Sequence, residues 1–296
     1  MLPIILITYS AARGWQITPR DREMLAALDY GPLTGRQLEK LSDTWAEPFP
    51  SARMVRERLQ RMAEAKLVKP HYYAVIRSIK PENYYVLTRR GYQLVHGPDS
   101  EPPTKGYCSP VTLVRQCHQQ ALSDFIVHTA VGAHRSGTNL TGFRRENTIR
   151  LDAGGKSVYP DCSFLLAAKD ETFRFFAEID TGSERVRSDK DTDSIERKLR
   201  TYDAFQTVKP GTRFRVLFVC LQNSRDRMLH ILETAARVIS DPNRTLFYGI
   251  TLTDYLTTLY PVTSPRFLDH RGGTHSLVPD MKAASLLSLA ELHQAA

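Results

Sequence analysis

The stretch "VYPDCSFLLAAKDETFRFFAEID", residues 158–180, consists of two apolar runs joined by a polar turn. Side chains on a strand alternate between faces, so Phe176, Glu178 and Asp180 project to one side and Phe175 and Ile179 to the other. The turn centres near residue 170. The pattern predicts a β-hairpin whose antiparallel register places Asp161 opposite residues 178–180.

This hairpin brings three carboxylates into one place if Asp161 points to the same face as its partners. Clustered acids repel each other and are costly to bury, and a divalent cation offsets that cost. Hard oxygen ligands favour Mg²⁺ or Mn²⁺. Asp161, Glu178 and Asp180 are therefore candidate metal ligands and catalytic residues. The alternatives are an acid at a strand start for Asp161 and a pair binding the following turn for the other two.

The segment "DSIERKLRTYDAFQ", residues 193–206, has helical periodicity, with Ile195, Leu199 and Tyr202 on its buried stripe. Lys198 lies at the border of that stripe. From there it reaches toward the carboxylates, where an ammonium group orients a water or stabilises a pentavalent phosphate. Lys198 is the fourth candidate catalytic residue, and a solvated surface lysine is the alternative.

Four further residues lie near this predicted site in the sequence, and each has an ordinary interpretation as well. Glu146, at the end of the strand that precedes the hairpin, is either a further ligand or a partner of Arg144 or Arg145. His118 and Asp124, on the preceding helix, are outer groups of the site or ordinary core and surface residues. Glu184 is expected to cap or pair within the loop after the hairpin.

The hairpin belongs to an alternating series of elements over residues 107–265. A long helix within 110–136 and a strand at 142–152 precede it, and a helix, strand, helix and strand follow at 193–206, 212–221, 224–239 and 245–252. This order predicts an α/β domain with a mixed sheet. Residues 266–296 are assigned to a C-terminal tail.

Residues 15–98 have a different pattern, with three amphipathic helices followed by two strands, "YYAVIR" and "NYYVLT". Thr18, Thr34 and Ser51 are expected N-caps of the three helices. This order predicts a winged helix-turn-helix, in which the third helix enters the DNA major groove and the hairpin forms the wing. The polar segment 99–106, "DSEPPTKG", is a linker between the domains.

Arginines line the face of the third helix that its apolar stripe leaves free, and two more follow the second strand. Arginine pairs with phosphates and reads guanine edges. The candidate DNA-binding residues are Arg53, Arg56, Arg58, Arg61, Arg89 and Arg90. The alternative is a solvated face on a domain that contacts protein.

The overall charge supports a polyanion partner. The formal net charge is +8, and residues 1–98 hold 15 Lys/Arg against 9 Asp/Glu. Cys108, Cys117, Cys162 and Cys220 form no CxxC pair and match no standard zinc spacing, which indicates a reducing, cytoplasmic compartment. No segment has the length of a membrane span or the pattern of a signal peptide.

The motifs "YPD" (159–161) and "AEID" (177–180), with a nearby lysine, resemble the PD-(D/E)xK nuclease superfamily. Asp180 stands where that motif places lysine, and Lys198 is the candidate for a lysine that has moved to the next helix. Behind a winged helix, the pattern "YPD…FFAEIDTGSE…KLRTYDAF" resembles the replication-relaxation family over roughly residues 15–260. Proteins of that family are encoded by plasmids and mobile elements.

The resemblance implies a restriction-endonuclease-like fold and Mg²⁺- or Mn²⁺-dependent nicking of double-stranded DNA. The implied partners are DNA and replication or mobilisation proteins, and a homodimer is a further option. Two other functions stay open: a catalytically inactive DNA-binding accessory factor or transcription regulator, and an unrelated α/β module without metal.

Overall fold

The computed structural model describes residues 16–74, 82–169, 171–187, 194–221 and 225–279. The chain divides into two compact units, Met1–Ser123 and Asp124–Ala296, and each unit is described by itself. Within the described residues, no helix is long and apolar enough to cross a membrane.

The first unit begins with three helices whose starts follow the predicted capping residues. Thr18 and Thr34 each form a capping box. The threonine side chain accepts the backbone N–H of the third helical residue, and the side chain of that residue accepts the threonine backbone N–H. Ser51 is the N-cap of the third helix but makes no side-chain cap bond. The helices are α1 (Pro19–Leu28), α2 (Gly35–Leu41) and α3 (Ala52–Glu64).

A three-stranded antiparallel sheet, in the order β1-β3-β2, accompanies these helices. Its strands are β1 (Leu33–Thr34), β2 (Val68–Tyr72) and β3 (Asn83–Leu87). β3 lies where a strand is predicted. β2 lies ahead of the predicted strand at 72–77, whose last three residues fall outside the described part of the chain.

The helix α4 (Arg89–His96) follows β3 and packs against α1 and β3. Thr88 caps it by accepting a bond from the Gly91 backbone N–H at 3.0 Å. A Cβ at Gly91 would lie 2.0 Å from the Leu67 carbonyl oxygen, so only glycine fits this approach. Two short 3₁₀ segments, Ser42–Thr44 and Leu113–Arg115, complete the unit before the long helix α5 (Gln116–Arg135) begins.

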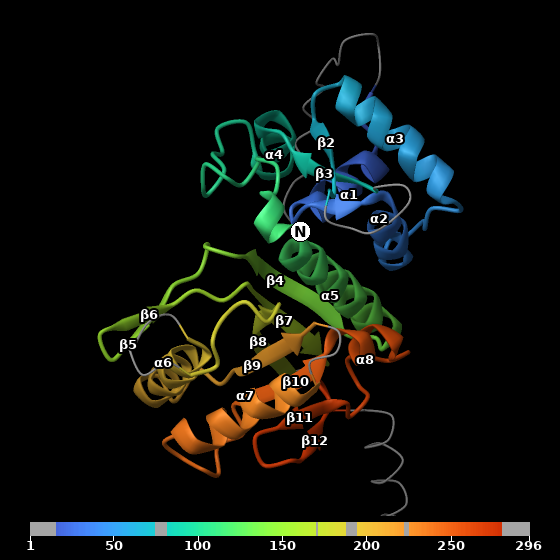
Figure 1. The fold of residues 1–296 in the computed structure, drawn as a ribbon. Helices are drawn as coiled ribbons and strands as arrows, with labels where there is room; N and C mark the ends of the chain where they lie inside the picture. The colour runs from blue at the N-terminus through green and yellow to red at the C-terminus, as the bar shows by residue number, and fades with distance from the viewer. Residues whose placement is uncertain (1–15, 75–81, 170, 188–193, 222–224, 280–296) are drawn as a thin grey trace, which may run out of the picture. The chain divides into compact units, whose positions relative to one another are not determined.

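The second unit is built on a seven-stranded mixed sheet in the order β12-β11-β10-β9-β8-β7-β4 (Figure 1). β8, β9 and β10 run parallel to each other, and the other neighbouring pairs are antiparallel. Its strands are β4 (Asn139–Arg145), β7 (Cys162–Ala168), β8 (Glu171–Asp180), β9 (Arg215–Cys220), β10 (Phe247–Thr251), β11 (Phe267–Asp269) and β12 (Thr274–His275). The predicted hairpin is β7–β8, and Asp170 in its turn lies outside the described residues.

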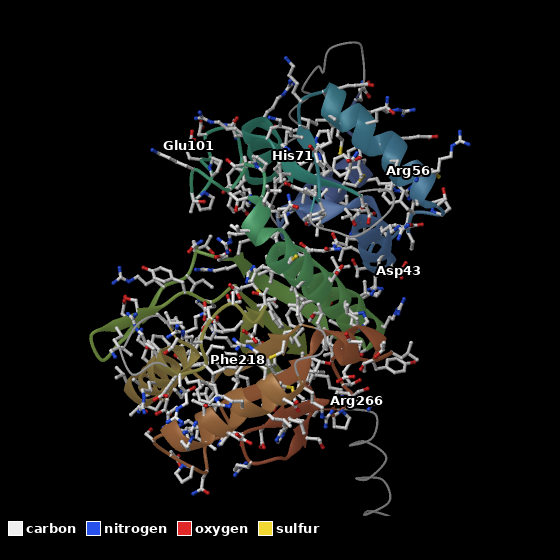
Figure 2. All side chains as sticks on the ribbon, in the orientation of Figure 1. Asp43, Arg56, His71, Glu101, Phe218 and Arg266 are labelled. Carbon is white, nitrogen blue, oxygen red and sulfur yellow. The ribbon has the colours of Figure 1, made fainter. Side chains whose placement is uncertain are left out.

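Helices cover both faces of this sheet, which explains why its central strands are apolar on both sides. The helices α6 (Ile195–Val208) and α7 (Arg225–Val238) pack on the face that carries Phe176, Val216 and Phe218, the last labelled in Figure 2. On the opposite face, aromatic rings join α5, the sheet and α8 (Leu252–Thr257). Phe125 lies 6.1 Å from Phe164 and 5.0 Å from Tyr255 between ring centroids.

The sheet is larger than the sequence pattern indicates. The predicted strand at 142–152 is two strands, the end of β4 and β5 (Leu151–Ala153), and β5 forms a separate hairpin with β6 (Lys156–Val158). β11 and β12 lie in the stretch assigned to a tail, where Phe267 is fully buried. These strands have only two or three residues, too few for alternation to be recognised.

Candidate functional site

Three acidic residues stand at the ends of three neighbouring strands of the sheet. β7 begins at Cys162, which pairs with Ala177, so Asp161 comes opposite Glu178. β4 ends at Arg145, which pairs with Cys162, so Glu146 follows beside Asp161. Because β4 and β8 flank β7, the register sets Glu146, Asp161 and Glu178 in a row along one edge of the sheet.

Backbone bonds hold Asp161 in this position. Its N–H donates to the Ala177 carbonyl at 3.0 Å, which continues the strand ladder by one residue. Its Oδ2 accepts the Ile179 N–H at 2.7 Å, and the side chain is buried, with the residue 9% exposed. The carboxylate is therefore fixed by β8 itself rather than by a flexible loop.

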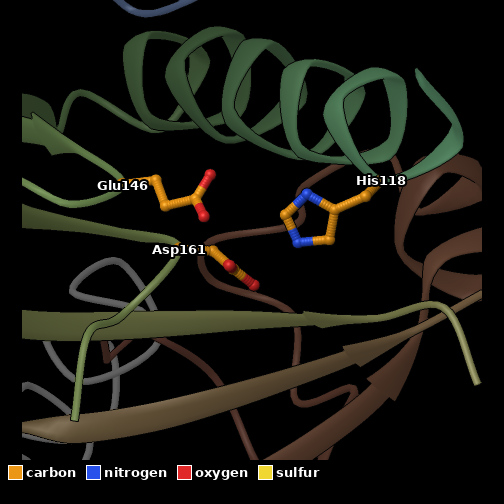
Figure 3. A group of neighbouring side chains, drawn as sticks. All are labelled: His118, Glu146 and Asp161. Carbon is orange, nitrogen blue, oxygen red and sulfur yellow. The ribbon is translucent and has the colours of Figure 1, made fainter. Parts of the chain in front are cut away.

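Asp161 also belongs to a group of residues whose arrangement suits a metal ion. Figure 3 shows His118, Glu146 and Asp161, each of which offers one ligand atom within 4.8 Å of the others. Two carboxylates and an imidazole can bind a divalent cation, and carboxylates favour Mg²⁺ or Mn²⁺. Glu178 and Asp180, which the sequence also proposes as metal ligands, are not members of this group.

Glu178 is buried on β8 and bonded at both carboxylate oxygens. Its Oε2 lies 2.9 Å from the Lys198 Nζ, and its Oε1 accepts the Tyr202 hydroxyl at 2.6 Å. The pKa of Glu178 is raised to about 7, chiefly by burial and also by the nearby Asp161 charge, while Lys198 and Tyr202 act in the opposite direction.

Lys198 comes from the first turn of α6 and lies between two acids. Its Nζ is 2.9 Å from Glu178 and 3.0 Å from the Glu184 Oε1. Burial by itself lowers the pKa of Lys198, but the carboxylates of Glu178, Glu184 and Asp161 outweigh burial and hold it above its usual value. The ammonium group therefore stays charged. The structure brings Lys198 to the acidic strand ends, as its place beside the buried stripe of α6 suggests.

Asp180 has a different partner from the other acids. Arg227 of α7 grips it with two bonds, 2.5 Å from Nε to Oδ2 and 2.8 Å from Nη2 to Oδ1. The same Nη2 donates to the Glu184 carbonyl. Through Arg227, Asp180 and the loop after β8 are connected to α7.

The candidate DNA-binding arginines of the first unit divide into two groups. Arg56, which Figure 2 labels, and Arg61 are exposed on α3. Arg53 is exposed as well, and its Nε lies 2.7 Å from the Glu57 carboxylate. Arg58, by contrast, donates at 2.6 Å to Asp21, which is fully buried on α1. Its position on the helix is part of the packing between α3 and α1.

The two arginines at the start of α4 are exposed and also have contacts within the unit. Arg89 pairs with Glu101, and Arg90 approaches the Ala65 carbonyl at 3.5 Å. Both side chains remain accessible to a ligand.

Two partners of the acids, Tyr202 and Arg227, could not be recognised from the sequence. Tyr202 reads as an ordinary member of the buried stripe of α6, although its hydroxyl binds Glu178. Arg227 lies 47 residues after Asp180, on a helix whose pattern shows only amphipathicity. A buried glutamate needs a charged or hydrogen-bonding partner, and this is the one indication in the sequence that such partners exist.

The chain was compared with known proteins. Neither the curated proteins nor the solved structures contain a match to it. The model of the replication-relaxation family matches residues 25–216, which is more than half of the chain and includes α3, the β7–β8 hairpin and α6. The chain therefore belongs to the replication-relaxation family.

Proposed function

We infer from membership in this family that the chain has a role in the replication or relaxation of plasmids or other mobile elements. We propose that the chain is a metal-dependent endonuclease that nicks DNA in that process. The observation that carries the proposal is the row of carboxylates Glu146, Asp161 and Glu178 at three adjacent strand ends, with Lys198 at 2.9 Å from the last of them.

The chemistry of these residues suits phosphodiester hydrolysis. Glu146 and Asp161, with His118, would hold a divalent cation, which acts as a Lewis acid on the phosphate and on a bound water. Lys198 would stabilise negative charge on the phosphate in the transition state. Glu178, whose pKa of about 7 lies near neutrality, is suited to accept the proton of the attacking water.

DNA would be held by the first unit, and the element order of that unit supports a winged-helix module. α1, β1, α2, α3 and the antiparallel pair β2–β3 follow in the sequence that such modules have. In this proposal, α3 enters the major groove, and its exposed Arg53, Arg56 and Arg61 contact phosphates or base edges.

The proposal is tested with supercoiled plasmid in Mg²⁺ or Mn²⁺. The Asp161→Asn variant keeps an oxygen that can accept the Ile179 N–H but removes the charge needed for a cation. We expect wild type to produce open circles and Asp161→Asn to do so at least tenfold more slowly. Glu233→Ala, an exposed acid on α7, is the matched control and should cut as wild type does. Identical topoisomer patterns for wild type and Asp161→Asn would refute the nuclease.

A separate measurement follows the metal itself. Calorimetric titration with Mn²⁺ should show one strong site in wild type and in Glu233→Ala, and a weakened site in Asp161→Asn. Equal Mn²⁺ affinity in all three proteins would remove Asp161 from the metal site, whatever the cutting assay gives.

A second function is supported by the bonds of the other acids. Glu178 is satisfied by Lys198 and Tyr202, and Asp180 by Arg227, so these carboxylates are already neutralised by protein partners. Such a site suits a non-catalytic DNA-binding accessory factor. This function predicts specific duplex binding that persists in EDTA and in Asp161→Asn, together with intact supercoiled plasmid.

A further inference from the structure

A pocket in the second unit lies apart from the acidic strand ends and has the composition of a site for a phosphate chain. Its volume is about 620 Å³. It is formed where α8, the segment before β11 and the first residue of α7 come together. Its polar side chains are Arg225, Arg266, Asp254, Thr257, Thr258, Ser264 and Thr274.

The charge of this pocket is net positive, because two arginines face a single acid, Asp254. Arg225 and Arg266 are both exposed, and neither forms an ion pair with any residue that the structure describes; Figure 2 labels Arg266. Exposed guanidinium groups beside hydroxyls are the usual donors to phosphate oxygens.

Two apolar side chains at the rim add a second feature. Tyr260 is 49% exposed and Leu259 is 65% exposed, directly after α8. An exposed tyrosine ring offers a flat surface on which an unpaired base can stack, and stacking beside cationic groups is how proteins hold single strands. A base within a duplex is already stacked and is not available for this contact.

The positive surface continues into a second pocket of similar volume. That pocket shares Tyr260, Ser264 and Pro265 with the first, so the two adjoin at the tyrosine. Its lining includes Arg135 at the end of α5 and Lys169 directly after β7. A flexible chain of phosphates can thus follow basic residues on both sides of Tyr260.

The C-terminal ends of β8 and β10 lie on the same edge of the sheet. β8 and β10 run parallel, with β9 between them, so Asp180 and Thr251 end at one edge, about 10 Å apart for two strand spacings. The first turn of α7 carries one residue that reaches Asp180 and one that lines the pocket. Its Arg227 binds Asp180, and its Arg225 lines the pocket.

From these observations we propose that the pocket of Arg225, Arg266 and Tyr260 binds single-stranded DNA. The arginines contact its phosphates and the tyrosine stacks on a base. In the nicking function proposed above, on which this inference builds, the strand bound here is one unpaired beside the acidic row. Binding at the pocket requires no metal and no cleavage.

The test uses the full chain in EDTA, where no strand is cut, with a fluorescent oligo(dT) followed by anisotropy. Arg225→Ala/Arg266→Ala should lower the affinity at least tenfold and make the slope of log K against log salt shallower by about 1.4, as expected for two phosphate contacts on a single strand. Tyr260→Ala should lower the affinity about tenfold, and Tyr260→Phe, which keeps the ring, should restore it.

The matched control is Arg174→Ala/Arg213→Ala, which removes the same charge from exposed positions outside the pocket. It should change the affinity for oligo(dT) less than twofold. An equal loss in both double variants, no effect of Tyr260→Ala, or a loss confined to duplex of the same length would each overturn the proposal. Because cleavage is not measured, a chain that cannot nick plasmid can still pass this test, and a nuclease can still fail it.

Discussion

Replacing Tyr202 by Phe removes the hydroxyl that donates to the buried carboxylate of Glu178 and changes little else. Both residue types fill the same space in the core under β8, where Tyr202 is fully buried. The hydroxyl donates to the Glu178 Oε1 at 2.6 Å, so its loss leaves one carboxylate oxygen without that donor. The consequence depends on whether Glu178 is charged, and pH decides that.

The size of the stability loss in Tyr202→Phe depends on whether Glu178 is protonated or charged. A hydrogen bond to a charged group contributes roughly 1.5–3 kcal/mol, whereas a neutral one contributes about 1 kcal/mol. Tyr202→Phe should therefore lower the free energy of unfolding by about 1 kcal/mol at pH 5, where Glu178 is protonated, and by roughly 2–3 kcal/mol at pH 9. The difference corresponds to a further rise in the pKa of Glu178, from about 7, by about one unit.

The stability of the wild-type protein should also depend on pH through Glu178. Burial raises the pKa of Glu178 from 4.5 in the unfolded chain to about 7 in the folded one. Between these values the folded chain binds the extra proton, so this group makes the protein less stable as the pH rises. In Tyr202→Phe the same loss should extend to a pH about one unit higher.

Urea unfolding at a series of pH values from 5 to 9 measures these quantities. Tyr255→Phe is the matched control, because Tyr255 is equally buried and its hydroxyl lies 2.7 Å from the neutral Thr129 Oγ1. We expect Tyr255→Phe to lose about 1 kcal/mol at every pH. A loss in Tyr202→Phe that is constant from pH 5 to 9 would refute the reasoning, since it would mean that Glu178 does not change charge in this range.

Two other predictions concern the first unit. Arg58→Met should lower the free energy of unfolding by roughly 3 kcal/mol, because it leaves the buried charge of Asp21 without its cation, whereas the exposed Arg56→Met should cost less than about 0.5 kcal/mol in urea unfolding. In a DNA-binding titration the order should reverse, with Arg56→Met the weaker binder at a temperature where both are folded; equal stability of the two would contradict the role given to Arg58. Gly91→Ala should destabilise the unit by about 2 kcal/mol, since its Cβ would meet the Leu67 carbonyl oxygen at 2.0 Å, and an unchanged melting temperature would show that this helix can shift.

The family relationship and the outline of both units follow from patterns that lie close together in the sequence. Alternation over residues 171–180 is enough to predict β8, and Thr18 and Thr34 mark helix starts through bonds that span only three residues. The turn between β7 and β8 fixes their register, and with it the position of Asp161 opposite Glu178.

The charge partners could not be predicted in the same way. Periodicity shows that Arg58 lies outside the apolar stripe of α3. It does not show that Arg58 binds Asp21, which lies 37 residues earlier. It likewise shows nothing of Arg227 beside Asp180. Both contacts depend on how two helices, or a helix and a strand, cross each other.

The sequence by itself determined the longer strands and helices, and it set the acids of one hairpin face to face, because a strand alternates its side chains and a short turn allows one register. Only the tertiary structure decided the surroundings of each acid: Lys198 and Tyr202 bind Glu178, Arg227 binds Asp180, and His118 and Glu146 lie near Asp161. The reason is physical. A buried charge takes the nearest available partner in space, and distance in space between separate elements is set by packing, which leaves no period in the sequence.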